Sequence, residues 1–421
     1  MKNLTRVAIV LATVVTAGAG AQQPISIQHI RPQDQRGVNM YEPSKHDTVT
    51  FQGTRVVFGG AFRQDFQGLG HSNESTTPLI NLGHGFNNAT ANLNLDVQLA
   101  KGIRVAMTSY LSSRHHNETW VKDGYILMDA SPIDNKYLNE IMSHTTLKVG
   151  HFEVNYGDGH FRRTDNGQAI FNPFVGNYIL DAFTTEVGAE AYVHDGWWLA
   201  MAGLTNGEVK GATTNPDRRS PAFFGKLGVD GKPLGDDLRL RFTMSAMSQA
   251  KSANQTLYGG DRAGSVYYNV VEGTTATEAA QAWSGMIRNP FGSGIQGQIL
   301  NGFAKYKGAE LFTQLEWARG KNATVDVDKR KISQQVVEGL YRLGAREQFY
   351  FGGRYNNFDG QLTPGSKAEM NVSRYQFGGG WYVTKNLLAK GEWVTQDYSG
   401  FTDIRKGAKF DGFMFSGAVS F

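Results

Sequence analysis

The chain has 421 residues, with 42 lysines and arginines against 38 aspartates and glutamates, and a formal net charge of +4 at pH 7. This near balance excludes the strongly basic class of nucleic-acid-binding proteins, so we expect no nucleic acid as a partner. The absence of cysteine excludes disulfides, thiol chemistry and thiolate metal sites.

The first 21 residues have the pattern of a secretory signal peptide. Lys2 and Arg6 precede a short apolar run, and small residues end in Ala19-Gly20-Ala21, where we expect cleavage and therefore export. Residues 22–50 contain three prolines, mixed charge and no regular period. They predict an irregular segment, which lies either on the periplasmic side of the fold or in its mouth.

From Arg55 onward the sequence alternates between apolar and polar residues, the period of two that predicts β-strands. The clearest strand is 89–99, and the same pattern predicts sixteen strands near residues 55–65, 89–99, 103–108, 120–128, 145–152, 184–194, 197–204, 222–229, 238–249, 295–306, 309–319, 332–343, 348–358, 371–383, 387–397 and 411–421. Because residues 129–144 have room for a helical turn and residues 266–271 for a further strand, the count stays between fourteen and eighteen.

The connections between these strands differ in length in a regular way. Those after even-numbered strands are mostly short, such as 101–102 and 307–308, and those after odd-numbered strands are mostly long, such as 155–183 and 250–294. Short turns at one rim and long extracellular loops at the other are typical of a transmembrane barrel. We therefore predict an all-β fold, a single antiparallel transmembrane β-barrel over residues 51–421.

The last strand, 411–421, has Phe413, Phe415, Val419 and Phe421 on one parity. It resembles the closing strand of Gram-negative outer-membrane β-barrels. That resemblance implies that the protein lies in the bacterial outer membrane. It also implies that Phe421 is the assembly signal read by the barrel-insertion machinery.

The two faces of the strands predict two environments. The apolar parity places aromatic residues near strand ends, as in the belts of a barrel that faces lipid: Trp317, Tyr355, Tyr375, Trp381, Phe349 and Trp198. The opposite parity carries more basic than acidic residues: Arg55, Arg63, Arg104, Lys122, Lys148, Lys226, Arg239, Arg241, Lys305, Arg342, Arg354, Arg374 and Lys390 against Asp65, Asp96, Glu186, Glu190, Glu310, Glu316, Glu338 and Glu392.

So many charged side chains predict a wet interior, because unpaired charges in an apolar core are costly. A barrel of about sixteen strands is wide enough for an aqueous channel. The basic excess predicts a mild preference for anionic solutes. The alternative is that opposite charges pair across strands and leave a weakly selective pore.

The connection 155–183 combines many apolar residues with Asp158, His160, Arg162, Arg163 and Asp165. A loop exposed to water does not need such apolar content, so we expect it to fold back against the barrel wall and place these five side chains across the pore.

Sixteen strands, a long third loop and a terminal Phe resemble the trimeric porins of Gram-negative outer membranes. The resemblance implies a homotrimer whose third loop narrows the channel between opposed acidic and basic groups. It implies that role for Asp158, Arg162, Arg163 and Asp165. The basic lumen is also similar to that of the anion- and phosphate-selective porins.

Taken together, these features predict a channel for passive diffusion of small hydrophilic solutes. We expect no catalysis, cofactor or metal, since the histidines lie mostly in loops without an obvious serine partner. One alternative is a plugged or substrate-specific transporter or an adhesin that uses residues 250–294 or the amino-terminal segment. The other is a barrel enzyme.

Overall fold

The computed structural model describes residues 31–42, 45, 51–112, 119–209, 216–261, 263–277, 283–322 and 325–421. The predicted signal peptide, residues 1–21, lies outside these residues, as do residues 22–30. The statements below concern the described parts of the chain.

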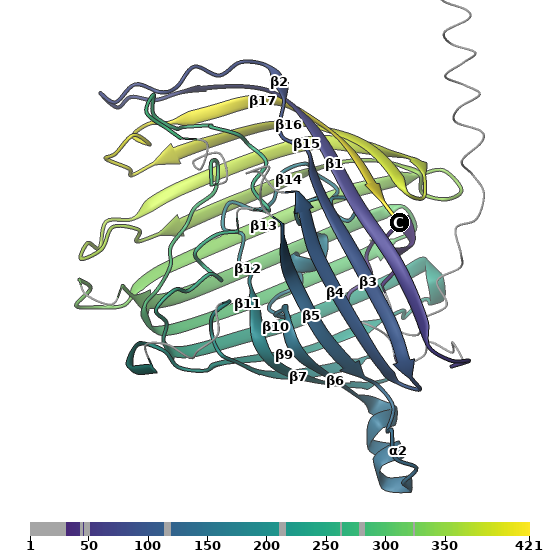
Figure 1. Cartoon of the computed structure of the whole chain (residues 1–421). Helices are drawn as coiled ribbons and strands as arrows, with labels where there is room; N and C mark the ends of the chain where they lie inside the picture. Colours follow the sequence, from purple (N-terminus) through teal and green to yellow (C-terminus); the bar gives the residue numbers. More distant parts are fainter. Residues whose placement is uncertain are drawn as a thin grey trace, which may run out of the picture.

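Sixteen long antiparallel strands close into one barrel (Figure 1). They are β1 (Arg55–Ser72), β3 (Thr90–Ala100), β4 (Ile103–Ser112), β5 (Trp120–Met128), β6 (Thr145–Glu153), β7 (Thr185–Asp195), β8 (Trp198–Thr205), β9 (Ala222–Gly231), β10 (Leu238–Lys251), β11 (Ser293–Tyr306), β12 (Ala309–Lys321), β13 (Arg330–Leu343), β14 (Phe349–Gly360), β15 (Met370–Thr384), β16 (Leu387–Ser399) and β17 (Lys409–Ser420). The predicted count of sixteen is confirmed, and a two-residue strand, β2 (Gly85–Phe86), pairs beside β1.

The first and last strands close the barrel. Residues 55–63 of β1 pair with β3, and residues 61–72 pair with β17. Phe421 extends this closure, because its backbone N–H donates to the Gly60 carbonyl and its own carbonyl accepts from the Gly60 N–H, both at 3.0 Å. A closed sheet leaves no unpaired edge in the membrane.

Alternation along each strand separates the outer face from the inner face. In β17, Phe413 and Phe415 are more than half exposed, whereas Met414 between them is fully buried. The predicted belt residues Trp198, Trp317, Tyr375 and Trp381 are likewise exposed on the outside. The apolar parity thus faces outward, as lipid contact requires.

Two connections left open by the sequence are now defined. Residues 129–144 include helix α2 (Lys136–His144), which projects beyond the barrel (Figure 1) and begins at Asn135, whose side chain accepts hydrogen bonds from two backbone N–H groups. Residues 266–271 form no strand but lie buried inside the barrel. Four 3₁₀ turns complete the described helices: Gln35–Gly37, Gly159–Arg162, Pro216–Arg218 and Gly235–Asp237.

Across the residues the structure describes, no helix is both long enough and apolar enough to span a membrane.

Three segments enter the barrel interior: the amino-terminal segment (31–42), the inner loop (154–184, between β6 and β7) and the described residues 252–261, 263–277 and 283–292 between β10 and β11, called the long loop. Apolar side chains of the inner loop and the long loop share the largest buried cluster with inward residues of the wall, among them Val175, Ile179, Leu180, Tyr258, Val266, Tyr267, Phe358, Phe410 and Met414. Tyr41 of the amino-terminal segment lies in a smaller buried cluster with Tyr178, Phe303, Phe312 and Val336. The hydrophobic core of this protein therefore lies inside its barrel.

The expectation of a largely wet interior is wrong for much of the lumen. Arg354, Arg374, Glu316 and Glu338 are at most 3% exposed. The physical reason is that the three interior segments cover these wall charges and supply partners for them, so the charges do not need water.

Candidate functional site: the folded segments inside the barrel

The inner loop is held by polar side chains of the wall. Glu392 accepts hydrogen bonds from the Val175 N–H at 2.8 Å and from the Tyr267 hydroxyl at 2.7 Å. Lys390, two residues away on β16, donates to three carbonyls of the inner loop at 2.7–2.8 Å. The peptide groups of an irregular segment have no strand partner, and these wall charges satisfy them instead.

Asp158 anchors the start of the inner loop. Its carboxylate accepts from Arg241 Nε at 2.8 Å and Nη2 at 2.9 Å, and Lys226 Nζ lies 2.8 Å away. Burial alone would raise the Asp158 pKa, but the two cations outweigh it and hold the pKa well below its usual range. Asp158 is therefore a charged anchor, tied to β9 and β10.

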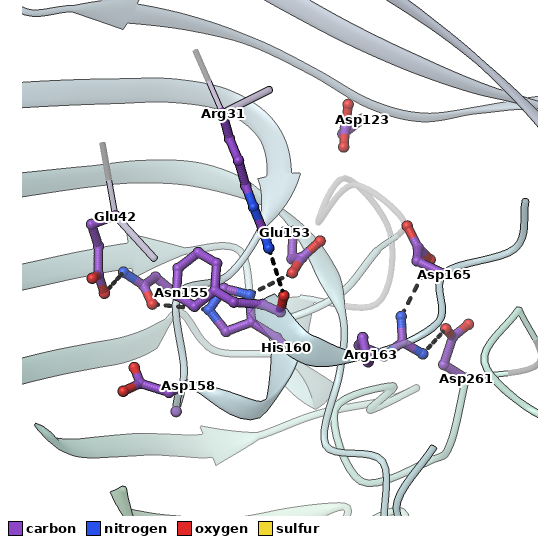
Figure 2. A network of polar contacts seen from close by, with 12 residues as sticks. Arg31, Glu42, Asp123, Glu153, Asn155, Asp158, His160, Arg163, Asp165 and Asp261 are labelled. Carbon is purple, nitrogen blue, oxygen red and sulfur yellow. Dashed lines mark hydrogen bonds and ion pairs between the residues drawn. The ribbon is translucent and has the colours of Figure 1, made fainter. Parts of the chain in front are cut away.

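Glu42 brings the amino-terminal segment to the same two cations. Its carboxylate lies 3.0 Å from Lys226 Nζ and 2.7 Å from Arg241 Nη2. Burial opposes ionisation, yet the positive charges of Arg241 and Lys226 lower the Glu42 pKa to about 2. Figure 2 shows Glu42 beside Asn155, whose side-chain N–H donates to Glu42 at 3.0 Å.

Arg162 and Arg163, adjacent in the chain, make different ion pairs. Arg162 binds Glu338 of β13 and the side chain of Asn39. Arg163 binds Asp181 of the inner loop at 2.5 Å. It also binds Asp261 of the long loop at 2.5 Å and Asp165 at 3.2 Å (Figure 2). The pair thus joins the inner loop to the wall, to the amino-terminal segment and to the long loop.

Asp165 and His160 face the opposite wall. Asp165 lies 2.6 Å from Lys122 Nζ of β5 and accepts from the Tyr110 hydroxyl. His160 Nδ1 lies 2.5 Å from Glu153, and its Nε2 lies 3.0 Å from Asn155 (Figure 2). All five residues predicted for the constriction are therefore inside the barrel, joined through one polar network.

A cavity of roughly 270 Å³ lies between this network and strands β3 to β7. Its charged lining is balanced, with the cations Arg31, Arg104, Lys122, Lys148 and Arg163 against the anions Glu42, Asp96, Asp123, Glu153 and Asp165. A second cavity of about 740 Å³ lies at the short-turn rim. Because Tyr41, Glu42 and His194 line both, the two cavities adjoin and reach from the rim into the barrel.

Most predicted wall residues face the interior and bind partners there. Arg63 pairs with Asp65, Arg104 with Asp129, Arg239 with Asp230, Arg354 with Glu338, and Glu190 with Lys148.

The other predicted wall residues differ in their surroundings. Arg374 donates to the Asn177 carbonyl at 2.5 Å, Glu186 accepts from Thr205, and Glu316 accepts from Gln314 at 3.2 Å. Arg55 instead lies at the rim, where it donates to Gln52 at 2.8 Å, away from the constriction.

Sequence reasoning missed the partners that come from irregular segments: Arg31, Asn39, Glu42 and Asp261. Nothing in the strand pattern marks them, since they belong to no strand. Among the described residues, no group of three histidine, aspartate or glutamate side chains is arranged to hold a metal ion.

No family model matches the sequence, and no curated protein sequence matches it. Solved structures do match the fold. The anion-selective porin from Comamonas acidovorans has a TM-score of 0.54 at 12% identity, over 87% of this chain and 100% of that one. The outer membrane channel DcaP of Acinetobacter baumannii gives 0.53 at 12% identity, over 88% and 99%. OmpT, an outer membrane protein of Vibrio cholerae, gives 0.51 at 10% identity, over 89% and 99%.

The chain therefore has the closed sixteen-stranded barrel fold of outer-membrane porins and channels. At these identities the likeness concerns the fold alone.

Proposed function

We propose that this protein is an outer-membrane channel for passive diffusion of small hydrophilic solutes. The observation that carries the proposal is the pair of adjoining cavities that lead from the short-turn rim to the inner loop, lined by charged and aromatic side chains. Polar linings of this kind suit hydrated solutes. The fold shared with porins and channels supports both the same role and an outer-membrane location.

The selectivity of the channel depends on the ion pairs inside it. The basic excess of the wall favours anions, but the cavity beside the inner loop has equal numbers of acidic and basic side chains. We infer a mild anion preference, weaker than the wall residues alone would give. Homotrimer formation, recognition of Phe421 by the insertion machinery and the absence of catalysis remain part of the proposal.

A second candidate is a channel specific for one class of solute, which the filled lumen favours. The inner loop and the long loop bury a shared apolar cluster across the barrel, so the free passage is narrow. A narrow passage admits fewer solutes than an open pore of the same strand number.

Conductance and reversal potential of the purified protein in a planar bilayer under a KCl gradient test the main proposal. Large stepwise openings with a small anion-directed reversal potential are expected. A folded protein that leaves the bilayer silent would contradict a diffusion channel. Liposome swelling in neutral sugars of increasing size separates the two candidates, because a specific channel would exclude even the small sugars.

A further inference from the structure

One imidazole joins two loops at the long-loop rim of the barrel. His71 has the inward parity of β1 and lies near the end of that strand, between the first loop (73–84, between β1 and β2) and the long loop. Its Nε2 lies 2.6 Å from the Ile80 carbonyl oxygen, and its Nδ1 lies 2.8 Å from the Val271 backbone nitrogen. Two segments that are far apart in the chain therefore meet at a single side chain.

The two backbone partners fix the protonation state of the His71 ring. The Val271 N–H can only donate, so Nδ1 must accept, and the Ile80 carbonyl can only accept, so Nε2 must carry a proton. Both conditions hold only in the neutral imidazole. The imidazolium has a proton on each nitrogen, and its Nδ1–H would face the Val271 N–H, donor against donor.

The same two loops also touch through their backbones, but over a very short stretch. Leu79 and Gly273 form an isolated antiparallel bridge, and the Ile80 N–H donates to the Glu272 carbonyl at 2.9 Å. An isolated bridge has no neighbouring pairs to support it, unlike the ladders of the barrel wall. The contact of His71 with Val271 is therefore a large share of what holds the two loops together.

Val271 has a backbone conformation that depends on its contacts. Its φ of 57° lies in the left-handed region, which a β-branched residue adopts only when its surroundings hold it there. The residue is 5% exposed, so its N–H has little access to water when the His71 acceptor is lost. Loss of this one acceptor therefore favours rearrangement of the long loop around Val271.

A second side chain of β1 holds the long loop in a similar way but does not titrate. Gln67 donates to the Tyr268 carbonyl at 2.9 Å and accepts from the Tyr268 N–H at 2.8 Å. An amide keeps both roles at every pH. Protonation of His71 is therefore expected to free the long loop at Val271 while Gln67 still holds it at Tyr268.

The charged and titratable side chains on the segments around His71 are Asp65 of β1, Glu74 and His84 of the first loop, Glu272 of the long loop, Lys409 and Asp411 of β17, and Asp403, Arg405 and Lys406 between β16 and β17. Lys409 and Asp411 flank Phe410, the residue opposite His71, and lie exposed on the other face of β17. Asp403 pairs with Arg405 at 2.5 Å, and Glu272 accepts from the Ser284 hydroxyl at 3.0 Å. Within the described parts of the chain, no carboxylate lies within 4.0 Å of the His71 ring to favour its charged form.

We propose that His71 is an acid-sensitive latch at the outer mouth of the barrel. Neutral His71 holds the long loop to the first loop, and protonation releases Val271 and loosens the long loop at the mouth. Because the closed latch needs the neutral ring, it is fully formed above the ordinary histidine pKa of about 6.5 and is lost as the pH falls below it. Its effect on conductance rests on the proposed channel function, whereas the release of Val271 does not.

The test is amide hydrogen exchange of the detergent-refolded protein at pH 8 and pH 5, corrected for the intrinsic pH dependence. The Val271 amide of the parent is expected to exchange roughly tenfold faster at pH 5, since one hydrogen bond is lost. In H71N the side-chain oxygen takes the place of Nδ1 and accepts at both pH values, so the difference is expected to disappear. The control H84N removes an exposed histidine of the first loop and is expected to behave like the parent.

H71A supplies a second variant, which has no acceptor at either pH and is expected to exchange rapidly at both. Equal corrected exchange of the parent at pH 8 and pH 5 would overturn the latch, and so would an H71N protein that keeps the difference. In a planar bilayer, the parent is expected to conduct better at pH 5 than at pH 8, and H71N equally at both. A silent bilayer beside pH-dependent exchange would contradict the channel and not the latch, whereas a pH-independent conductance would overturn the position of the latch at the mouth.

Discussion

Arg163 of the inner loop and Asp261 of the long loop form an ion pair of 2.5 Å inside the barrel. Neither residue belongs to a strand, yet the pair joins the two largest segments that fill the lumen. Burial raises the Asp261 pKa despite the opposing charge of Arg163, so the carboxylate is costly to keep ionised without its partner. The two loops therefore depend on each other for their place in the barrel.

Replacing both Arg162 and Arg163 with alanine is expected to shift the reversal potential toward cations. The change removes two buried positive charges and leaves the carboxylates of Glu338, Asp181 and Asp261 in the lumen. Rings of acidic side chains favour cations. The measurement is the reversal potential in a planar bilayer under a KCl gradient.

The control is Arg405→Ala, which removes an arginine paired with Asp403 in the connection between β16 and β17, away from the inner loop. It is expected to leave the reversal potential unchanged. An unchanged reversal potential in the double variant would show that passing ions do not sense the inner loop.

Gly176→Ala is expected to separate the inner loop from the long loop. A Cβ at Gly176 would overlap the ring of Tyr267, which packs against it. Overpacking of this kind costs about 1–3 kcal/mol, and the irregular loops yield to it more readily than the hydrogen-bonded strands do. We expect faster hydrogen exchange of the Val175 amide and a higher conductance.

Gly417→Ala is the control for this substitution, because nothing lies within 4 Å of the added Cβ. Its exchange and conductance are expected to match the parent. Unchanged exchange in Gly176→Ala would mean that Tyr267 moves aside without disturbing the inner loop.

The barrel was predictable because its pattern is local. Each strand shows its two faces within ten residues, as in 89–99, and the lengths of the connections reveal the two rims. The entry of the inner loop into the lumen was also predictable, since apolar residues such as Phe174 and Ile179 need cover.

The packing of the lumen was not predicted, although the inward face of β11 carried a signal. Ile295, Ile299 and Phe303 share the luminal parity and are buried, which indicates a packed loop rather than water beside them. The sequence carries no comparable signal for which charged residues form ion pairs with each other. Arg163 and Asp261 are 98 residues apart, and Lys226 and Glu42 are 184 apart, so a period of two gives the face but not the partner.

Acid is expected to release the amino-terminal segment. The Glu42 pKa is lowered from 4.5 to about 2, so the docked segment favours the ionised form. Its contribution, about 3 kcal/mol at most, is fully present above pH 4.5 and lost as the pH falls toward 2. Hydrogen exchange of residues 31–42, measured at pH 6 and at pH 3 and corrected for the intrinsic pH dependence, is expected to show less protection in acid.

Glu42→Gln is expected to remove most of that pH dependence and to reduce protection already at pH 6. Asp34 provides the control, because it pairs with Arg36 within the segment and not with the wall. Asp34→Asn is expected to keep the acid-dependent release. A parent protein protected equally at both pH values would contradict the role of Glu42.

Deletion of Phe421 is expected to impair barrel assembly. Its backbone makes two hydrogen bonds of 3.0 Å with Gly60 that continue the pairing of β17 with β1, and its ring, 59% exposed, lies on the outer face. The deletion removes both the last bonds of the closure and the terminal aromatic. The measurement is the fraction of protein that reaches the membrane as a folded, heat-modifiable barrel. Phe413→Ala is the control, because it removes an equally exposed aromatic from the same face of β17 and leaves the chain end intact. If both variants assemble poorly, general loss of apolar surface is responsible. Normal assembly of the truncated protein would show that closure does not depend on its last residue.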